Sequence, residues 1–546
     1  MIDHFRKFTL INGVAKLLVV FSSHRAAVLW LPSFVALLLA VLPSILGGVP
    51  APMVHDERGY LLAAETFSEG HLTNPAHPHW PHFETIHQLQ QPSYSGMYPP
   101  MQSAFLAVGQ WLGEPILGVW LSVVLMVAAI SWMLSGYFNR YWSLVGGLVA
   151  AFQLVVLGEP FGQSHMMGYW SQSYWGGAVA AAGGALVLGA LPRLMNKRRF
   201  GWSPGFCLGI GLALMGMSRP KEGLIVALPV AVVLLFWLIK NRTSSRGYVT
   251  LYFIAPVSGF ILAILLTTLA HNKAVTGVSI KTPWQAHYEQ YVVFPLFLWQ
   301  QPTKTVEWNN PQLERFHGEW ELDLHRRSQT ITGFIDTSLR KVARYWVFYL
   351  GPVLTLPLLA SLCLLRRWWV LLAAVICALI QLNNLLSFAA FPHYAAPATG
   401  ALYLLVIAGL RYGYLLLRKT SKIGQGLIPL VLLVGVGFSA YGVVKSAQGN
   451  AYSKDLERHR ISQQLDALAG THLVMMEYGP EHNVHDEWVF NQASIDQAKV
   501  VWARALSAEQ NQQLRSYYPD REVWLIKVGF ADEKVALTPY TSVVEN

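Results

Sequence analysis

Residues 27–48 read AVLWLPSFVALLLAVLPSILGG, a stretch without a single charged side chain. A helix of this length crosses the roughly 30 Å of hydrocarbon in a bilayer, because each helical residue rises about 1.5 Å. Similar apolar runs recur along the 546 residues, of which 53% are hydrophobic and only 13% charged. The mean hydropathy is +0.36. This composition excludes a soluble multidomain protein and predicts a polytopic α-helical membrane protein.

We expect about eleven membrane-spanning helices of the length that a bilayer requires. They are placed at residues 27–48, 115–137, 142–158, 172–191, 204–218, 222–239, 248–270, 342–364, 368–390, 396–417 and 425–445. With a cytoplasmic N-terminus, the basic loops around Arg140, Arg193, Lys240, Arg366 and Arg411 all fall on the cytoplasmic side. Basic residues favour that side of a membrane, so this orientation is the one expected. It also explains the net charge of +10 without a nucleic-acid partner.

Three polar segments then fall on the opposite side of the membrane: loops at about 49–114 and 271–340, and the region from about 446 onward. In the first loop, helices are expected at Asp56–Glu69 and Met101–Trp111. The C-terminal region has β-rich runs at His472–Tyr478, Lys499–Ala503 and Glu522–Val528, and a helical stretch at Ser507–Tyr517. The sequence therefore predicts a transmembrane module at 1–445 and a small soluble α/β domain at 446–546.

Several classes of site are excluded by what the chain lacks. Cys207, Cys363 and Cys377 all lie in apolar segments, which fits neither a disulfide framework nor a thiolate metal site. The sequence contains no phosphate-cradling glycine loop and no nucleophile elbow. A nucleotide-driven enzyme or a serine hydrolase is therefore not indicated.

The adjacent acids Asp56 and Glu57 follow directly after the first span. Two carboxylates at the mouth of a helix bundle are costly unless they bind something or take up a proton. A carboxylate there could take the proton from an acceptor hydroxyl, because partial solvation keeps it ionised. The alternative is that both side chains are simply solvated at the end of a span.

A second outward turn holds Glu159, followed by an aromatic run that includes Trp170 and Trp175. Aromatic faces commonly hold sugar rings, so these tryptophans, with Tyr60 and Tyr98 of the first loop, are candidates for sugar or acceptor binding. The alternative for the tryptophans is a belt at the membrane interface.

A third outward turn contains Arg219 and Lys221, against the usual bias of basic residues toward the cytoplasm. The planar fork of an arginine suits a phosphate, so we expect Arg219 to bind a lipid phosphate with Lys221 as a secondary ligand. The alternative is that Lys221 or Arg219 pairs with Glu222 or with a neighbouring helix end. His393 and Tyr394, in a fourth outward turn, could also contact the phosphate, or His393 could cap a broken helix.

The first loop is rich in histidine, and Glu84 stands three residues before His87. These two residues are the candidates for a divalent metal site. The prolines between neighbouring histidines fit no helical pair of ligands. No cofactor is therefore required by the sequence, and a metal stays an open alternative.

The acid pair after the first span, the long helical first loop, the arginine in a later outer turn and some eleven spans resemble the C-type glycosyltransferase superfamily. The stretches Asp56–Phe67, Tyr98–Gln102 and Tyr478–Val489 resemble bacterial members of its protein O-mannosyltransferase and aminoarabinose-transferase branch. The resemblance covers about residues 27–445. The C-terminal domain matches no acceptor-binding module of that superfamily.

The resemblance implies an inverting transfer of a sugar from a polyprenyl-phosphate donor to a hydroxyl acceptor of unknown identity. Asp56 would activate the acceptor, Glu57 would assist it, Glu159 would be a second loop acid and Arg219 would contact the phosphate. It also implies the bacterial inner membrane, with the C-terminal domain in the periplasm. We expect Asp56 and Arg219 to share one chamber. The alternative, a transporter or a lipid-linked sugar flippase, would need polar groups deep within the spans.

Overall fold

The structure is a computed structural model that describes residues 2–157, 168–196, 202–240, 253–302, 305–419, 422–530 and 535–540. The chain forms two compact units. The first unit comprises Met1–Val49, Gly118–Thr267 and Phe334–Gly449. The second comprises Pro50–Leu117, Thr268–Gly333 and Asn450–Asn546, which brings both long polar loops and the C-terminal region together.

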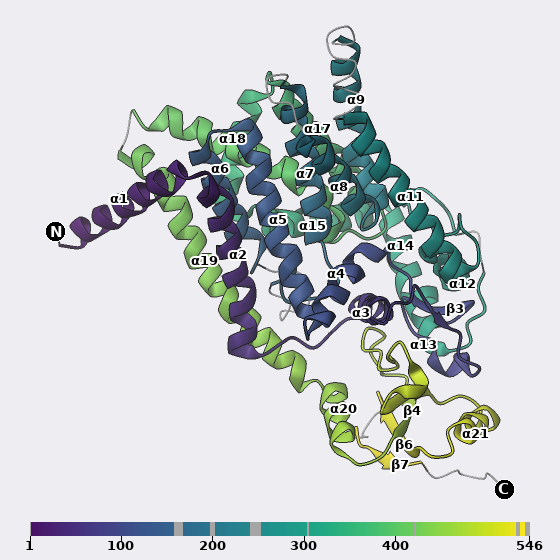
Figure 1. Ribbon diagram of the computed structural model, residues 1–546. Helices are drawn as coiled ribbons and strands as arrows, with labels where there is room; N and C mark the ends of the chain where they lie inside the picture. The colour runs from purple at the N-terminus through teal and green to yellow at the C-terminus, as the bar shows by residue number, and fades with distance from the viewer. Residues whose placement is uncertain are drawn as a thin grey trace. The chain divides into compact units, whose positions relative to one another are not determined.

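Long apolar helices build the first unit (Figure 1). In chain order the long helices are α1 (Ile2–Ser23), α2 (Arg25–Gly47), α5 (Pro115–Tyr137), α6 (Arg140–Leu154), α7 (Ala178–Met195), α8 (Ser203–Gly216), α9 (Pro220–Lys240), α11 (Ala255–Thr276), α15 (Ile331–Tyr349), α16 (Gly351–Ser361), α17 (Trp368–Leu386), α18 (Thr399–Leu417) and α19 (Lys422–Asp455). Among the described residues, 8 helices are long and apolar enough to cross a membrane, or 9 if one bent pair is a single span. The chain is a multi-pass membrane protein.

Several of the expected spans differ from the structure. At 142–158 and 204–218 the structure has the shorter helices α6 and α8, which are not among the described helices that are long enough to cross a membrane. The expected span at 342–364 is broken, because α15 and the helical segment after it meet at an angle of 97° next to Gly351, whose φ is +55°. The expected span at 172–191 begins only at Ala178, because Gly176 and Gly177 adopt positive φ values that interrupt a helix. Of the expected span at 248–270, residues 248–252 lie outside the described residues, and the helix found there, α11, continues to Thr276. The total of eleven stays a prediction.

The helices of the first unit expose their large apolar side chains, as a lipid-facing surface requires. On α9, Leu228, Val232 and Phe236 are exposed. In a soluble protein such a face would be unfavourable, whereas lipid tails solvate it. By contrast, α7 is buried along most of its length and consists mainly of alanine, glycine, leucine and valine. Small residues allow neighbouring backbones to approach closely, and so α7 lies in the interior of the unit.

The second unit combines short helices with two small sheets. Its elements are α3 (His55–Ser68), β1 (Asn74–Pro75), η1 (Trp80–Phe83), β2 (Gln88–Leu89), β3 (Ser93–Gly96), α4 (Pro100–Trp111), α12 (Pro283–Tyr291), α13 (Pro311–Leu313), η3 (Glu314–Trp320), α14 (Glu321–Gln329), α20 (Glu457–Ala467), β4 (His472–Tyr478), η7 (Ile495–Gln497), β5 (Val500–Arg504), α21 (Ala508–Tyr517), β6 (Glu522–Val528) and β7 (Thr538–Pro539). One sheet has the order β1-β3-β2 and is antiparallel. The other has the order β5-β4-β6-β7.

The C-terminal sheet is a parallel core with one antiparallel edge strand. His472 pairs with Val500 on one side and with Glu522 on the other, and only β7 runs antiparallel. The two faces of β4 alternate, as the two-residue period of a strand requires. Leu473 and Met475 pack with α21 and with Leu62, Phe83 and Tyr94 of the first loop. Val474 and Met476 pack with Ile461 and Leu465 of α20 and with Trp488. The α/β fold of this region is therefore as expected from its sequence.

Candidate active site

Asp56 lies in the first turn of α3, where three side chains surround its carboxylate. The Tyr98 hydroxyl donates to Oδ1 over 2.6 Å. Nδ1 of His55 lies 3.1 Å from Oδ2, and Nδ1 of His87 lies 3.7 Å from it. The Asp56 side chain remains 29% exposed, while those of His55 and His87 are 9% and 12% exposed. The carboxylate is therefore the part of the cluster that a ligand reaches most easily.

The surroundings of Asp56 favour its ionised form. Burial by itself raises the pKa of this carboxyl group. The charge of His87, the charge of and hydrogen bond from His55, and the hydrogen bond from Tyr98 together outweigh burial. The pKa of Asp56 therefore lies well below its ordinary value. At neutral pH the group is therefore a carboxylate.

The same cluster has the donor atoms of a metal site. The ligand atoms of His55, Asp56 and His87 all lie within 4.8 Å of one another. The two histidine Nδ1 atoms are only 2.9 Å apart, so they must share a proton or face a common cation. Imidazole nitrogen with carboxylate oxygen is a donor set that suits zinc and related divalent ions. His87 also has a φ of 63°, an uncommon conformation for a non-glycine residue.

Glu57 makes different contacts from its neighbour Asp56. Its Oε2 accepts the backbone N–H of Met53 over 2.8 Å and that of Val54 over 3.2 Å. The side chain is only 3% exposed. A carboxylate in this position satisfies amide groups at the start of α3 and complements the positive end of the helix dipole. Its direct role in chemistry stays a prediction.

The structure does not place Glu84 with His87. Oε1 of Glu84 accepts the Tyr291 hydroxyl over 3.1 Å, and the side chain is 2% exposed. Burial raises the pKa of this carboxyl group. Among the described residues, the group of possible metal ligands contains His55, Asp56 and His87 but not Glu84. Glu84 instead belongs to a buried contact between the first loop, the second loop and the C-terminal region.

Tyr60 and Tyr98 lie side by side next to Asp56. Their rings stack with centroids 4.3 Å apart and an interplanar angle of 11°. Tyr60 is 3% exposed, so its ring supports Tyr98 from the interior of the unit. Tyr98 then presents its hydroxyl to the carboxylate of Asp56. Sugar or acceptor binding by this pair stays a prediction.

Sequence reasoning missed the side chains that surround His55 from the other polar segments. The His55 ring packs against Phe316 at 4.9 Å and stacks on His485 at 6.0 Å. Behind them, Nδ1 of His317 lies 2.6 Å from Oε2 of Glu321. The available signal was that histidines recur in the second loop and in the C-terminal region as well as in the first loop. Nothing local in the sequence shows that they gather on His55.

The first unit holds the candidate phosphate ligands. Cζ of Arg219 lies 4.8 Å from the centroid of the Tyr394 ring, which holds the guanidinium at the start of α9. Nζ of Lys221 lies 3.3 Å from Oε1 of Glu222. The ion-pair alternative therefore applies to Lys221. The role of Arg219 toward phosphate stays a prediction, since Arg219 and Asp56 belong to different units.

The remaining candidates of the first unit form an aromatic cluster. The Tyr169 hydroxyl lies 2.7 Å from Nδ1 of His393, and Trp175 donates its indole N–H to the backbone oxygen of Tyr169. Trp170 is 1% exposed and packs edge-on against Phe348 at 4.9 Å. Packing thus accounts for both tryptophans, and sugar binding by them stays a prediction. Glu159 lies outside the described residues.

No protein-family model matches the chain, and no curated protein sequence matches it significantly. Several solved structures match the chain. The chain is similar in fold to ArnT from Cupriavidus metallidurans. The TM-score is 0.49 at 12% identity, over 94% of this chain and 93% of ArnT. With ArnT bound to undecaprenyl phosphate, the TM-score is 0.48 at 12% identity, over 92% of this chain and 93% of ArnT.

The Archaeoglobus fulgidus oligosaccharyltransferase gives a TM-score of 0.45 at 11% identity, over 82% of this chain. The chain spans only 62% of the length of that protein. Likeness at such low identity concerns the fold alone. It does not show the activity of this chain.

Proposed function

We propose that the chain is a membrane glycosyltransferase in which Asp56 is the general base. The observation that carries this proposal is the geometry around Asp56, an ionised and partly exposed carboxylate held in place by Tyr98, His55 and His87. A general base must be ionised, positioned and reachable by the group that loses the proton. The proposed donor is a polyprenyl-phosphate sugar, the class of lipid found in the structures of ArnT with undecaprenyl phosphate and of the archaeal oligosaccharyltransferase with a dolichol-phosphate.

In the proposed reaction, Asp56 takes the proton of an acceptor hydroxyl. The acceptor oxygen forms a bond to the anomeric carbon of the sugar, while the bond from that carbon to the lipid phosphate oxygen breaks. The polyprenyl phosphate leaves with the electron pair, and the anomeric configuration inverts. The developing negative charge on the leaving group needs a cation, and Arg219 is proposed to supply it. That Asp56 and Arg219 meet in one chamber stays part of the proposal.

A divalent cation fits the donor atoms of His55, Asp56 and His87. When bound, such an ion would supply positive charge beside the acceptor oxygen. Tyr98 keeps the Asp56 carboxylate oriented through its hydroxyl. The histidine-rich surroundings favour zinc or a similar ion over magnesium, because magnesium prefers oxygen ligands.

We further propose that the chain lies in the bacterial inner membrane with its N-terminus in the cytoplasm. The basic loops of the sequence support this orientation. The polar segments of the second unit would then face the periplasm, where a water-soluble or surface-bound acceptor meets a lipid-linked donor. A cysteine-labelling experiment from either side of the membrane, with single cysteines at Gln110 and Arg418, tests this orientation.

The proposal is tested with purified full-length protein and a panel of polyprenyl-phosphate sugars, by measuring release of polyprenyl phosphate. Asp56→Asn keeps the shape of the side chain but removes its ability to accept a proton. We expect release to fall by about 10²–10⁴-fold, the usual contribution of a general acid or base. Asp323→Asn is the control, because Asp323 is an exposed residue of the same unit. Activity of Asp56→Asn close to that of the control would refute the role of Asp56.

A second measurement addresses the phosphate ligand. Arg219→Gln is expected to weaken binding of undecaprenyl phosphate by about tenfold or more, since it removes a charge-assisted contact. Arg366→Gln is the control, because Arg366 is an exposed arginine of the same unit. Equal affinities of the two variants for the lipid phosphate would contradict the role of Arg219.

A further inference from the structure

The second unit contains a cavity of about 170 Å³ next to the Asp56 cluster. Residues from four parts of the chain line it: Ala51–His55 and Arg58 before and at the start of α3, Ser453 near the end of α19, Leu456–His459 at the start of α20, and His485–Trp488 and Phe490 of the C-terminal region. His55 lines the cavity and also contacts Asp56. Pockets for drug-sized ligands measure roughly 300–1,000 Å³, so this one suits a single small group.

Two arginines share one wall of the cavity. Cζ of Arg58 lies 5.2 Å and Cζ of Arg458 lies 5.9 Å from the centroid of the Phe490 ring. Arg458 is fixed by hydrogen bonds to the backbone oxygens of Trp488, over 2.8 Å, and Phe490, over 3.1 Å. Burial, and after it the charge of Arg58, lower the pKa of Arg458 to about 9. The two guanidinium groups therefore repel each other, and an anion between them would relieve that repulsion.

The start of α20 adds a second source of positive potential. The first residues of α20, Glu457–His459, line the cavity. Among the described residues, its N-cap Leu456 makes no side-chain hydrogen bond to the first turn. The N–H groups at the start of a helix lack partners within the helix, and together with the helix dipole they favour an anion.

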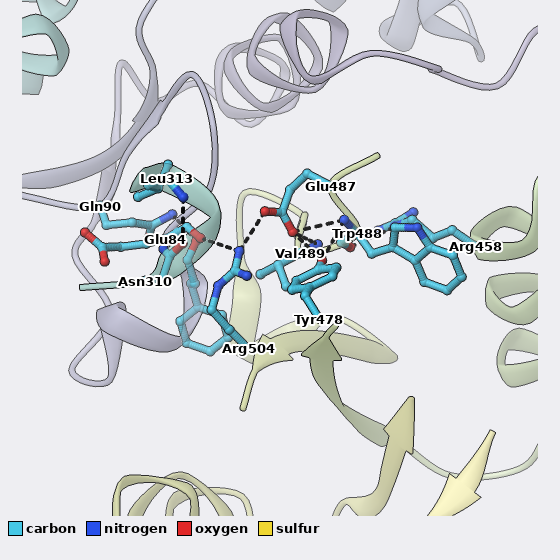
Figure 2. Close-up of polar contacts among 11 residues, drawn as sticks. Glu84, Gln90, Asn310, Leu313, Arg458, Tyr478, Glu487, Trp488, Val489 and Arg504 are labelled. Atoms are coloured by element: carbon cyan, nitrogen blue, oxygen red, sulfur yellow. Dashed lines mark hydrogen bonds and ion pairs between the residues drawn. The ribbon is translucent and has the colours of Figure 1, made fainter. Parts of the chain in front are cut away.

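The lining also contains carboxylates, and the charges of Asp486 and Glu487 act on Arg458 in the opposite direction from that of Arg58. Glu487 is already engaged, because its Oε2 lies 2.6 Å from Nη2 of Arg504 and its Oε1 accepts the Tyr478 hydroxyl (Figure 2). The same Oε1 accepts the backbone N–H groups of Trp488 and Val489, which fixes this wall of the cavity. Glu457 and Asp486 are exposed and therefore strongly solvated.

We propose that this cavity binds an anionic group, a phosphate or a carboxylate, of the acceptor substrate. Arg58, Arg458 and the first turn of α20 recognise the charge, and the acceptor hydroxyl lies toward Asp56. The assignment to the acceptor rests on the proposed function, whereas binding of the anion does not. The C-terminal region thus takes part in substrate recognition through α20 and residues 485–490.

Binding is tested without turnover, by calorimetric titration of the full-length protein in uncharged detergent. The probes are glucose 6-phosphate, inorganic phosphate and uncharged glucose. We expect glucose 6-phosphate to bind more tightly than glucose, and Arg58→Gln to weaken its binding about tenfold or more. His459→Glu, which adds a negative charge at the cavity, is expected to weaken it as well. Arg460→Gln is the control, because Arg460 is exposed on the same helix and does not line the cavity.

Equal binding of glucose and glucose 6-phosphate, or unchanged binding in both Arg58→Gln and His459→Glu, would overturn the proposal. His459→Glu keeps the test valid if Arg58→Gln fails to fold. Repeating the titration in nanodiscs with and without phosphatidylglycerol identifies the source of the anion. If phosphatidylglycerol competes with glucose 6-phosphate, the result supports a lipid headgroup as the anion. If it does not compete, the result supports a soluble acceptor. Because the measurement needs no catalysis, a failure of the Asp56→Asn test leaves it interpretable.

Discussion

Different kinds of contact stabilise the interior of each of the two units. In the first unit, helix α7 buries alanine and glycine, and a Cβ atom on Gly184 would lie only 1.9 Å from the backbone oxygen of Pro397. In the second unit, charged and histidine side chains are buried, among them Glu487, Arg504 and His82. Within lipid, apolar contact alone does not favour one helix pairing over another, so close packing of small residues has to do so. Where water is the solvent, buried polar groups can fix positions through hydrogen bonds instead.

The same contrast applies to the two candidate functional residues. Asp56 is surrounded by hydrogen-bonding side chains from separate parts of the first loop, which define the direction of its carboxylate. Arg219 lies over the face of the Tyr394 ring, so a contact between a cation and an aromatic ring helps to hold its guanidinium group.

Removing Glu487 is expected to have the largest effect on stability, because Arg504 is 4% exposed and would be left without its ion-pair partner. Loss of one partner of a buried ion pair costs about 3–5 kcal/mol. Glu487→Ala should therefore speed hydrogen exchange of β4 and β5 in the full-length protein. The control is Glu477→Ala on β4, where the carboxylate is 39% exposed and 3.8 Å from Lys527. Equal exchange in the two variants would mean that the buried pair does not hold the second unit together.

Two glycine variants test the packing of the first unit, because they are expected to change its stability in opposite directions. Gly184→Ala places a methyl group against the backbone of Pro397 and should destabilise the unit by about 1–3 kcal/mol. Gly413→Ala in α18 meets nothing within 4 Å and should stabilise its helix by about 0.5–1 kcal/mol. Thermal unfolding in detergent, followed by circular dichroism, compares them. A stabilising effect of Gly184→Ala would show that close contact at α7 is not required.

Acid should weaken the second unit through its buried histidines. His82 is 2% exposed, and burial, only partly opposed by hydrogen bonds, lowers its pKa below the ordinary 6.5. Burial likewise lowers the pKa of His77, against the opposing charge of Asp496. Below pH 6.5 the unfolded chain binds protons that the folded chain does not, so the free energy of unfolding falls as the pH is lowered.

The pH effect is measured as hydrogen exchange of β5 between pH 7.5 and 5, corrected for the intrinsic effect of pH on exchange. His82→Gln removes one of these buried groups, so the remaining pH dependence should be smaller than in the parent protein. His71→Gln is the control, because His71 is exposed in the same loop. A parent protein whose corrected exchange does not change over this range would contradict the assignment of neutral, buried histidines.

A small effect is expected at a helix cap in the second unit. The Ser507 hydroxyl accepts the backbone N–H of Gln510 at the start of α21. Ser507→Ala should cost about 1 kcal/mol, the usual value for an N-cap. Ser516→Ala, an exposed position near the end of the same helix, should cost less. Local exchange of the α21 amides compares the two variants, and equal exchange would show that the cap does not limit the helix.

Much of the fold could be predicted from local sequence. The strands β4 and β6 have the predicted bounds, and β5 is displaced by one residue. Short runs rich in apolar, aromatic and β-branched residues favour such strands. The break at Gly351 was not predicted, because the apolar run continues across it. Hydropathy carries no information about the direction of a helix axis. The late start of α7 was also missed, because the positive φ values of Gly176 and Gly177 that interrupt a helix there cannot be read from hydropathy.

The candidate site was only partly predictable. Asp56 could be found from its position after the first span, and His55 is its neighbour in the chain. The contacts from His87 and Tyr98 depend on the return of the first loop, and the contact of His55 with His485 depends on the C-terminal region. No spacing rule connects residues that are more than 400 positions apart.

By itself the sequence determined that this chain crosses a membrane several times and ends in a small α/β region, because apolar length and two-residue periodicity are local properties. Only the tertiary structure decided that Glu57 caps a helix while Asp56 remains partly exposed, that Glu84 is buried away from His87, and that two arginines from distant segments line one cavity. Hydrogen bonds and ion pairs act over a few ångströms. Which side chains come that close depends on how the whole unit packs.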